Sequence, residues 1–423
     1  MNIEENYYIV AVGASAGGLE AIESLFSNIP ADCGISFVLV QHLSPDYKSL
    51  MVELLSKKTN LKVIRAENEM RLEKNCIYLI PPKKNMTVYH RHLILSEQDH
   101  SHGLNLPIDI FFKSLAHDVT EKAVGVILSG TGSDGTSGLK EIKEHGGLMI
   151  VQEPESAQFD GMPKSAINTG LVDFVLPPVE IAEKLVAYVN SPQLSISEKA
   201  NLLNANQDGL LRIFSLIRDQ HKIDYSFYKL STMVRRIERR MSLNQIGDMQ
   251  EYIRYLESNQ KEVSTLYKEL LIGVTNFFRD PEAFTIMEKS IIPELISKNE
   301  NHEIRIWVAG CSTGEEAYSV AILCHEYLEK TGYKSDVKIF ATDVDPEAII
   351  KASNGIYNDS IVNDISENLL SKYFIKESYG FKVSRTIREM VVFAKHNLVK
   401  DPPFPNIDLI TCRNLLIYLQ PSL

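Results

Sequence analysis

Three residues whose types suit nucleophilic catalysis follow strand-like runs between residues 7 and 190. Ser15 lies in the stretch GASAG at 13–17, which fits the G-x-S-x-G pattern of a sharp strand-to-helix turn that exposes a serine oxygen. His42 ends the next run, ISFVLVQHL, and Asp134 lies in a glycine-rich turn after AVGVILSG. A serine needs a base, and the base needs an orienting carboxylate, so these residues are candidates for a hydrolytic triad.

The opening turn has a second interpretation, because glycine-rich turns between a strand and a helix also hold phosphates. A dinucleotide site would place an acidic residue at the end of the second strand, where this chain has Gln41 and His42. Taken singly, His42 could be a structural residue at a strand end and Asp134 a turn or helix-capping residue. The shared placement of the three residues at the carboxyl ends of parallel strands favours the triad, and the helix after Ser15 could supply oxyanion donors.

A second glycine-rich turn, VAGCSTGEE at 308–316, points to different chemistry. Gly310 and Gly314 permit close approach of a ligand, but Glu315 and Glu316 fall in the first helical turn and would repel a pyrophosphate. Asp343 ends the next strand, where a ribose-binding carboxylate is expected. A cofactor with a ribose, an amine and a sulfonium but no phosphate suits both acids, which favours S-adenosylmethionine. The alternatives are that Glu316 complements a helix dipole and that Asp343 caps a helix.

A basic helical stretch lies between these two regions. The run YKLSTMVRRIERRM places four arginines within two helical turns: Arg235, Arg236, Arg239 and Arg240. Arginines at i and i+4 share a helix face. Such a run can be a solvated surface, and on a chain this acidic it is also a candidate docking surface for an acidic protein.

Composition narrows the function classes. The 423 residues include 44 Lys and Arg against 55 Asp and Glu, and the formal net charge of -11 argues against a dedicated nucleic-acid binder. The chain has no apolar run of about 20 residues, and its N-terminus, MNIEENYY, does not resemble a secretory signal, so we expect no membrane insertion. Its five cysteines are scattered and lack CxxC spacing, which indicates reduced thiols and a cytoplasmic location.

Two histidine pairs, in HRH at 90–92 and HSH at 100–102, are the candidates for metal ligands. No cysteine or acidic ligand set joins these histidines. We therefore predict no metal site.

The elements that must position these residues fall into three regions. Residues 1–190 alternate strand and helix patterns, which predicts a doubly wound parallel sheet, with an antiparallel excursion in IYLIPPKKNMTVYHRHLILSEQ. A polar linker is predicted at 191–208 and a small all-helical domain at 209–285. Residues 286–423 predict a Rossmann-like sheet with four strands, IRIWVAG, VKIFATDVD, MVVFAKHNL and IDLITC, which we expect to be incomplete at the C-terminus.

The first region resembles the catalytic domain of CheB-type chemotaxis protein-glutamate methylesterases. The matching stretches are GASAGGLEAI, VLVQHLSPDY, IYLIPP, PIDIFFKSLA, GVILSGTGSDG and GMPKSAI. The resemblance implies that Ser15, His42 and Asp134 are the triad and that γ-glutamyl methyl esters on receptor signalling helices are hydrolysed through an acyl-enzyme. Ala16 stands where many relatives have threonine. No receiver domain precedes Ser15, so we do not expect phosphorylation of this chain to control the esterase.

From residue 209 onward the sequence resembles CheR-type chemotaxis receptor glutamate methyltransferases. The matching stretches are DYSFYKLSTMVRRIERRM, LLIGVTNFFRDPEAF, VAGCSTGEEAYS, FATDVDPEAI, FAKHNLVKDPPF and DLITCRNLLIYL. The resemblance implies docking of the receptor on the arginine helix and a set of residues around S-adenosylmethionine: Thr275, Arg279, Glu316, Asp343, Asn397, Leu398, Arg413, Asn414 and Tyr418. Of these, Arg279 and Tyr418 are interpreted as positioning groups for methyl transfer. Gly273 departs from relatives that have asparagine there.

The sequence thus predicts a fused pair of opposing enzymes, one removing methyl groups from receptor glutamates and one adding them. A scaffold whose transferase half only binds receptor or cofactor is the alternative. A nucleotide-dependent oxidoreductase is disfavoured by His42 and by the glutamates after Gly314.

Overall fold

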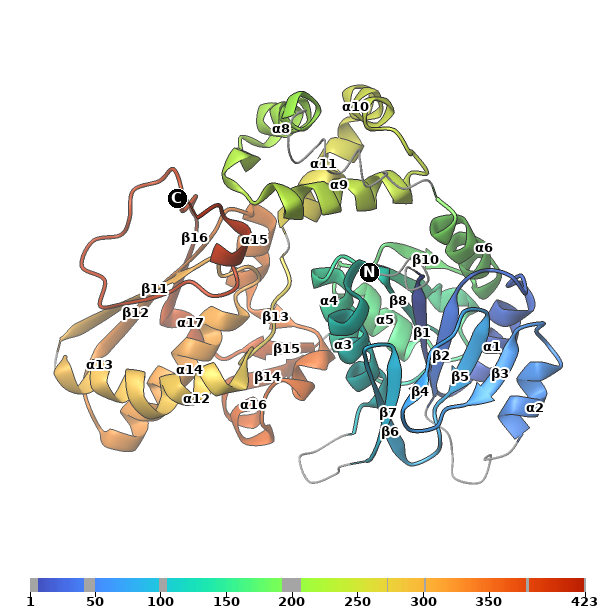
Figure 1. Cartoon of the computed structure of the whole chain (residues 1–423). Helices are drawn as coiled ribbons and strands as arrows, with labels where there is room; N and C mark the ends of the chain where they lie inside the picture. The colour runs from blue at the N-terminus through green and yellow to red at the C-terminus, as the bar shows by residue number, and fades with distance from the viewer. Residues whose placement is uncertain are drawn as a thin grey trace. The chain divides into compact units, whose positions relative to one another are not determined.

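The computed structural model describes residues 7–41, 50–98, 105–191, 207–271, 273–299, 302–377 and 380–421 (Figure 1). These residues belong to two compact units. The first comprises Met1–Asn204 with Arg235–Ser258, and the second comprises Ala205–Val234 with Asn259–Leu423. The predicted linker falls almost entirely outside the described residues, and the domain boundaries at 190, 208 and 285 stay predictions. No helix in the described ranges is long and apolar enough to cross a membrane.

The first unit is built on a seven-stranded parallel sheet with strand order β10-β9-β8-β1-β2-β5-β3. Its strands are β1 (Ile9–Ala14), β2 (Ser36–Gln41), β3 (Lys62–Arg65), β5 (Cys76–Leu79), β8 (Ala123–Ile127), β9 (Leu148–Gln152) and β10 (Phe174–Leu176). This confirms the predicted doubly wound sheet. We missed β3, a four-residue edge strand with exposed ends, because Lys62 and Arg65 hide its short apolar core.

Alternate residues of the central strand pack on opposite faces of this sheet. Ile9 and Ala11 lie in one apolar cluster with Phe111, while Val10 and Val12 lie in the other with Ile22. The helices that cover the sheet are α1 (Gly18–Ser27), α2 (Leu50–Ser56), α3 (Pro107–Val119), α4 (Thr136–Glu144), α5 (Gly161–Ile167) and α6 (Pro178–Val189). Burial on both faces explains why the strand sequences are almost continuously apolar.

The predicted antiparallel excursion is confirmed. Strands β6 (Lys84–Tyr89) and β7 (His92–Glu97) pair antiparallel, and β4 (Met70–Arg71) adds to β7. The first strand of the predicted stretch, β5, instead belongs to the parallel sheet.

The middle of the chain is helical, as predicted. Its helices are α8 (Gln207–His221), α9 (Leu230–Leu243), α10 (Met249–Ser258), α11 (Gln260–Leu271), α12 (Pro281–Ile286) and α13 (Ile292–Lys298). Helix α9 begins in the second unit, and from Arg235 onward it belongs to the first. The basic stretch of α9 is therefore part of the same compact unit as the seven-stranded sheet.

The second unit contains the four predicted strands as a parallel sheet with order β16-β12-β11-β17. These strands are β11 (Glu303–Ala309), β12 (Asp336–Asp343), β16 (Val391–Lys395) and β17 (Leu409–Thr411), with helices α14 (Glu315–Thr331), α15 (Pro346–Asn354), α16 (Glu367–Tyr373) and α17 (Arg385–Glu389). A small antiparallel sheet inserts β13 (Ile356–Tyr357), β14 (Phe374–Glu377) and β15 (Gly380–Val383). The predicted fold class is confirmed for both α/β regions.

Candidate active sites

Ser15 lies in a three-residue turn between β1 and α1. Its backbone N–H donates to the carbonyl oxygen of Ser129 at 3.0 Å, and its own carbonyl accepts from Gly18 at 3.0 Å. Gly17 precedes α1 with φ +66°, and an added Cβ there would lie 2.5 Å from Gln158 Oε1. Glycine is therefore required at this corner, as the sequence pattern predicts.

The glycine-rich turn after β8, which contains Gly130, packs directly against Ser15. A Cβ on Gly130 would lie 2.9 Å from the Cβ of Ser15 and 2.2 Å from the sulfur of Met162. The hydroxyl of Ser129 donates to the carbonyl of Ala16 at 3.0 Å, and the N–H of Ser129 donates to Gln152 Oε1 at 2.8 Å. The turns after β1 and β8 thus hold each other in place, and the sequence analysis missed the roles of Ser129 and Gln152.

Asp134 is 3% exposed and lies in the turn between β8 and α4. Its two carboxylate oxygens accept the backbone N–H groups of Ile108, at 3.1 Å, and Asp109, at 2.9 Å, in the first turn of α3. This is the capping role that the sequence left open. It is compatible with an orienting role, because each carboxylate oxygen can accept more than one hydrogen bond. His42, the predicted base, lies outside the described residues.

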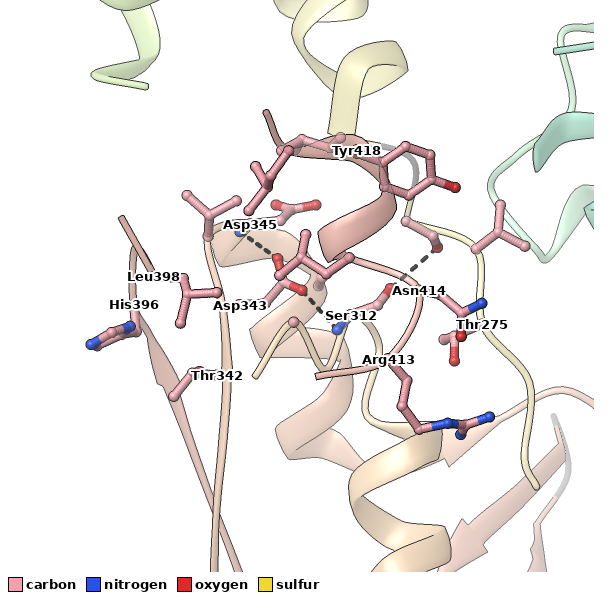
Figure 2. Close-up of a pocket in the computed structure, with 18 of the residues that line it drawn as sticks. Thr275, Ser312, Thr342, Asp343, Asp345, His396, Leu398, Arg413, Asn414 and Tyr418 are labelled. Atoms are coloured by element: carbon pink, nitrogen blue, oxygen red, sulfur yellow. Dashed lines mark hydrogen bonds between the residues drawn. The ribbon is translucent and has the colours of Figure 1, made fainter. Parts of the chain in front are cut away.

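The predicted cofactor residues come together in the second unit, in a pocket at the carboxyl ends of β11 and β12 (Figure 2). The segment after α11 and the turns after β16 and β17 complete its walls. The predicted residues in its lining are Thr275, Arg279, Glu316, Asp343, Asn397, Leu398, Arg413, Asn414 and Tyr418. That they contact the cofactor stays a prediction.

Asp343 joins the two turns that form the floor of this pocket. Its carboxylate accepts the N–H of Ser312 at 2.8 Å and the N–H of Asp345 at 3.0 Å, as Figure 2 shows. Burial raises the pKa of Asp343 above its usual value, against the lowering effect of these hydrogen bonds. The capping residue of α15 is Asp345, which accepts from Glu347. Asp343 therefore fixes the glycine turn of β11 against β12.

Glu316 lies in the first turn of α14 and lines the same pocket. Burial raises the pKa of its carboxyl, while the Thr411 side chain and the charge of Arg413, with Nη1 at 3.7 Å from Oε2, act to lower that pKa. Its Oε1 atom is buried and has no hydrogen-bond partner within the described ranges. A cationic amine in the pocket would satisfy this acceptor, so the residues present fit a ligand such as S-adenosylmethionine.

Arg413 and Arg279 are fixed by the backbone around them. Arg413 Nη2 donates to the carbonyl of Arg279 at 2.6 Å and contacts Asp280 at 2.8 Å, and Arg279 Nη1 donates to Val274 at 3.1 Å. The sequence analysis missed Tyr228, whose ring lines the pocket and whose pKa burial raises to about 12. Nothing in the local sequence distinguishes Tyr228 from Tyr225, which is buried in the core.

Three models of known families match successive parts of the chain. The family model of CheB methylesterase matches residues 10–185, the model of the CheR methyltransferase all-alpha domain matches 208–271, and the model of its SAM-binding domain matches 273–423. A putative protein-glutamate methylesterase/protein-glutamine glutaminase of Leptospira interrogans is 35% identical over 190 residues, which cover 43% of this chain and 94% of the relative. A chemotaxis protein methyltransferase of Borreliella burgdorferi is 34% identical over 232 residues, covering 52% of this chain and 82% of the relative.

The chain belongs to the CheB methylesterase and CheR methyltransferase families. It therefore carries a methylesterase domain and a methyltransferase domain in one polypeptide. The match to the SAM-binding domain identifies S-adenosylmethionine as the cofactor of the CheR part. An uncharacterized 104.1 kDa protein of Rhodobacter capsulatus is 39% identical over 394 residues, 88% of this chain, and the chain spans only 41% of that relative's length.

The arginines predicted to dock the receptor do not form one exposed face of α9. Arg236 is 1% exposed and Arg239 is 4% exposed, and both contact the CheB part, whereas Arg235 and Arg240 are half-buried. The sequence could not show this burial, because the contacting residues lie 92 positions away. Docking stays a prediction.

Of the candidate metal ligands, His92 Nδ1 lies 2.8 Å from the carbonyl oxygen of His90, while residues 100–102 lie outside the described ranges. No group of three metal-ligand side chains occurs among the residues that the structure describes.

Proposed function

We propose that this chain modifies chemotaxis receptors in both directions, hydrolysing glutamate γ-methyl esters and methylating glutamates from S-adenosylmethionine. The observation that supports this proposal is the presence of two strand-turn-helix sites, one with Ser15 in its turn and one lined by the acidic residues Glu316 and Asp343. We also propose receptor signalling helices as the partner and a cytoplasmic location. Five cysteines without disulfides support that location.

In the esterase, Ser15 Oγ attacks the ester carbonyl while His42 takes its proton and Asp134 orients the imidazole. Methanol leaves with the returned proton, and water then hydrolyses the acyl-enzyme to the carboxylate. The N–H of Ser15 already donates to Ser129. Because the N–H of Gly18 donates to the carbonyl of Ser15, we propose the N–H groups of Ala16 and Gly17 as oxyanion donors, next to the positive end of the α1 dipole.

In the transferase, a receptor carboxylate needs no base, because a glutamate with its ordinary pKa of about 4.3 is already ionised near neutral pH. S-adenosylmethionine supplies an electrophilic methyl group when it is bound. In this proposal Glu316 Oε1 would accept from the amine of the cofactor, and Asp343 would accept from its ribose hydroxyls. Arg279 and Tyr418 position the carboxylate, and exclusion of water by the pocket walls favours the in-line attack.

The test measures both reactions in the same samples of the full chain, as methanol release from a methylated receptor fragment and as label transfer from S-adenosylmethionine. Ser15→Ala should lower methanol release roughly 1,000-fold or more and leave methyl transfer intact. Asp343→Asn should do the reverse. Ser27→Ala, at an exposed serine of α1 whose hydroxyl donates to the carbonyl of Glu23 at 2.7 Å, is the matched control. Methanol release that is equal in wild type and Ser15→Ala would refute the serine mechanism.

A further inference from the structure

The basic stretch of α9 contacts the C-terminal end of α4 in the CheB part. Arg236 Nη2 donates to the carbonyl of Glu144 at 2.8 Å, and its Nη1 donates to that of Lys143 at 3.3 Å. Arg239 Nε and Nη2 donate to the carbonyl of Gly147 at 3.1 and 2.9 Å. The last carbonyls of a helix carry the negative end of its dipole, so the guanidinium group of Arg236 binds a favourable site at the end of α4, while Arg239 binds a carbonyl of the segment that follows it.

A buried carboxylate completes the contact. Arg239 forms an ion pair with Asp173, and their side chains are 2% and 6% exposed. Asp173 also accepts from Lys143 Nζ at 3.2 Å and from the backbone N–H of Met149 at 2.9 Å. A buried charge persists only when it is paired and hydrogen-bonded, so Arg239 and Asp173 depend on each other.

The end of α9 is also part of the apolar packing of the CheB part. Leu243 is 7% exposed and lies in the same cluster as Tyr8, Leu148, Leu185 and Tyr188. Arg235 lies near the turn after α4, where a Cβ on Gly146 would be 3.9 Å from its Nε. Polar and apolar contacts together make this a hydrogen-bonded and well-packed interface within one compact unit.

We propose that the CheB part masks the basic helix of the CheR part, so that Asp173 with the end of α4 and an acidic receptor segment compete for the same guanidinium groups. The proposal rests on the proposed function, which makes the glutamate-bearing receptor segment the docking partner. Arg236 and Arg239 cannot serve both partners, because every contact described above uses the atoms that would bind a carboxylate. Receptor docking therefore requires α9 to leave the CheB part, and masking weakens the apparent affinity by the fraction of molecules that are released.

The test removes the counter-charge without touching α9. In the full chain, Asp173→Asn should speed hydrogen exchange of the α9 amides from Arg235 to Leu243 and tighten binding of an acidic receptor fragment on the order of tenfold. The affinity for S-adenosylmethionine, titrated directly, should not change. Asp32→Asn, an exposed aspartate of the same unit, is the matched control and should change none of these quantities.

A second pair of variants keeps the proposal testable if Asp173→Asn does not fold. Arg236→Ala removes two donors from the other side of the contact, and the carbonyls it leaves can bind water. It should speed exchange in α9, whereas Arg254→Ala, at an exposed position of α10, should not.

Methyl transfer by the wild-type chain distinguishes a failure of the masking proposal from a failure of the proposed function. Transfer to the fragment with no change in α9 exchange or fragment affinity in Asp173→Asn overturns the masking alone. No transfer and no binding in any variant overturns the receptor as substrate, and the competition with it.

Discussion

The two glycine turns of this protein have the same architecture and different chemistry. In both, a buried strand ends in a short turn and a glycine with positive φ begins the helix, Gly17 before α1 and Gly314 before α14. In both, a backbone N–H in the turn is held by the neighbouring strand end. For Ser15 the acceptor is the main-chain oxygen of Ser129, and for Ser312 it is the carboxylate of Asp343.

That difference decides what each turn can do. A main-chain acceptor holds the first turn without adding charge, which leaves the serine as its reactive group. The carboxylate acceptor and the glutamates after Gly314 make the second turn an acidic site that suits a cationic ligand without phosphates. The two turns share the same backbone arrangement, and the side chains at a few positions decide whether the turn presents a nucleophile or forms a cofactor site.

The largest effect on this comparison is expected at Gly130, which packs against Ser15 of the first turn and against Met162 of α5. Gly130→Ala would push a Cβ into Ser15 and Met162, and displacement of the nucleophile by about 1 Å should lower methanol release about 100-fold. Methyl transfer by the same protein serves as the internal control. A variant that folds and keeps full esterase rate would show that the packing of the two turns does not set the position of Ser15.

A smaller effect is expected in the second turn at Glu316. Glu316→Gln should weaken binding of S-adenosylmethionine about ten- to hundredfold, since a hydrogen bond to a charged group is worth about 1.5–3 kcal/mol. Calorimetric titration of the full chain measures this, and methanol release should stay unchanged. Unchanged cofactor affinity would remove Glu316 from the site.

The same residue predicts a pH dependence. Burial raises the pKa of Glu316, and only the ionised carboxylate pairs with an amine, so affinity should fall on acidification at a higher pH than for an ordinary glutamate. Because burial also raises the pKa of Asp343, part of the dependence should remain in Glu316→Gln. Titrations across acidic pH on both proteins separate the two contributions.

The smallest effect is expected at Gly273, the position that departs from the family pattern. Among the described residues a Cβ there would meet Ser312 Oγ at 3.5 Å, an ordinary contact, so the position accepts a Cβ without strain. Gly273→Asn should tighten cofactor binding about fivefold, the value of one added hydrogen bond of about 1 kcal/mol. Weaker binding would mean that the turn after α11 needs glycine.

The sequence determined the strand pattern of both sheets, the two glycine turns and the candidate residues in them. These features depend on local periodicity and on backbone conformations that only certain residues adopt, so they can be predicted from short stretches. It did not reveal β3, because the charged Lys62 and Arg65 flank an apolar core of only two residues in this edge strand. Nor did it reveal that Ser129 and Gln152 hold the Ser15 turn from strands far along the chain.

Only the tertiary structure decided the environment of α9. From the sequence alone, its four arginines are expected to form a basic helix face that is exposed to solvent or binds an acidic partner. In the fold, Arg236 and Arg239 are buried against carbonyls and a carboxylate of the CheB part. The physical reason is that charge patterning fixes which residues can pair, whereas the partner of a buried charge is set by packing between segments far apart in the chain.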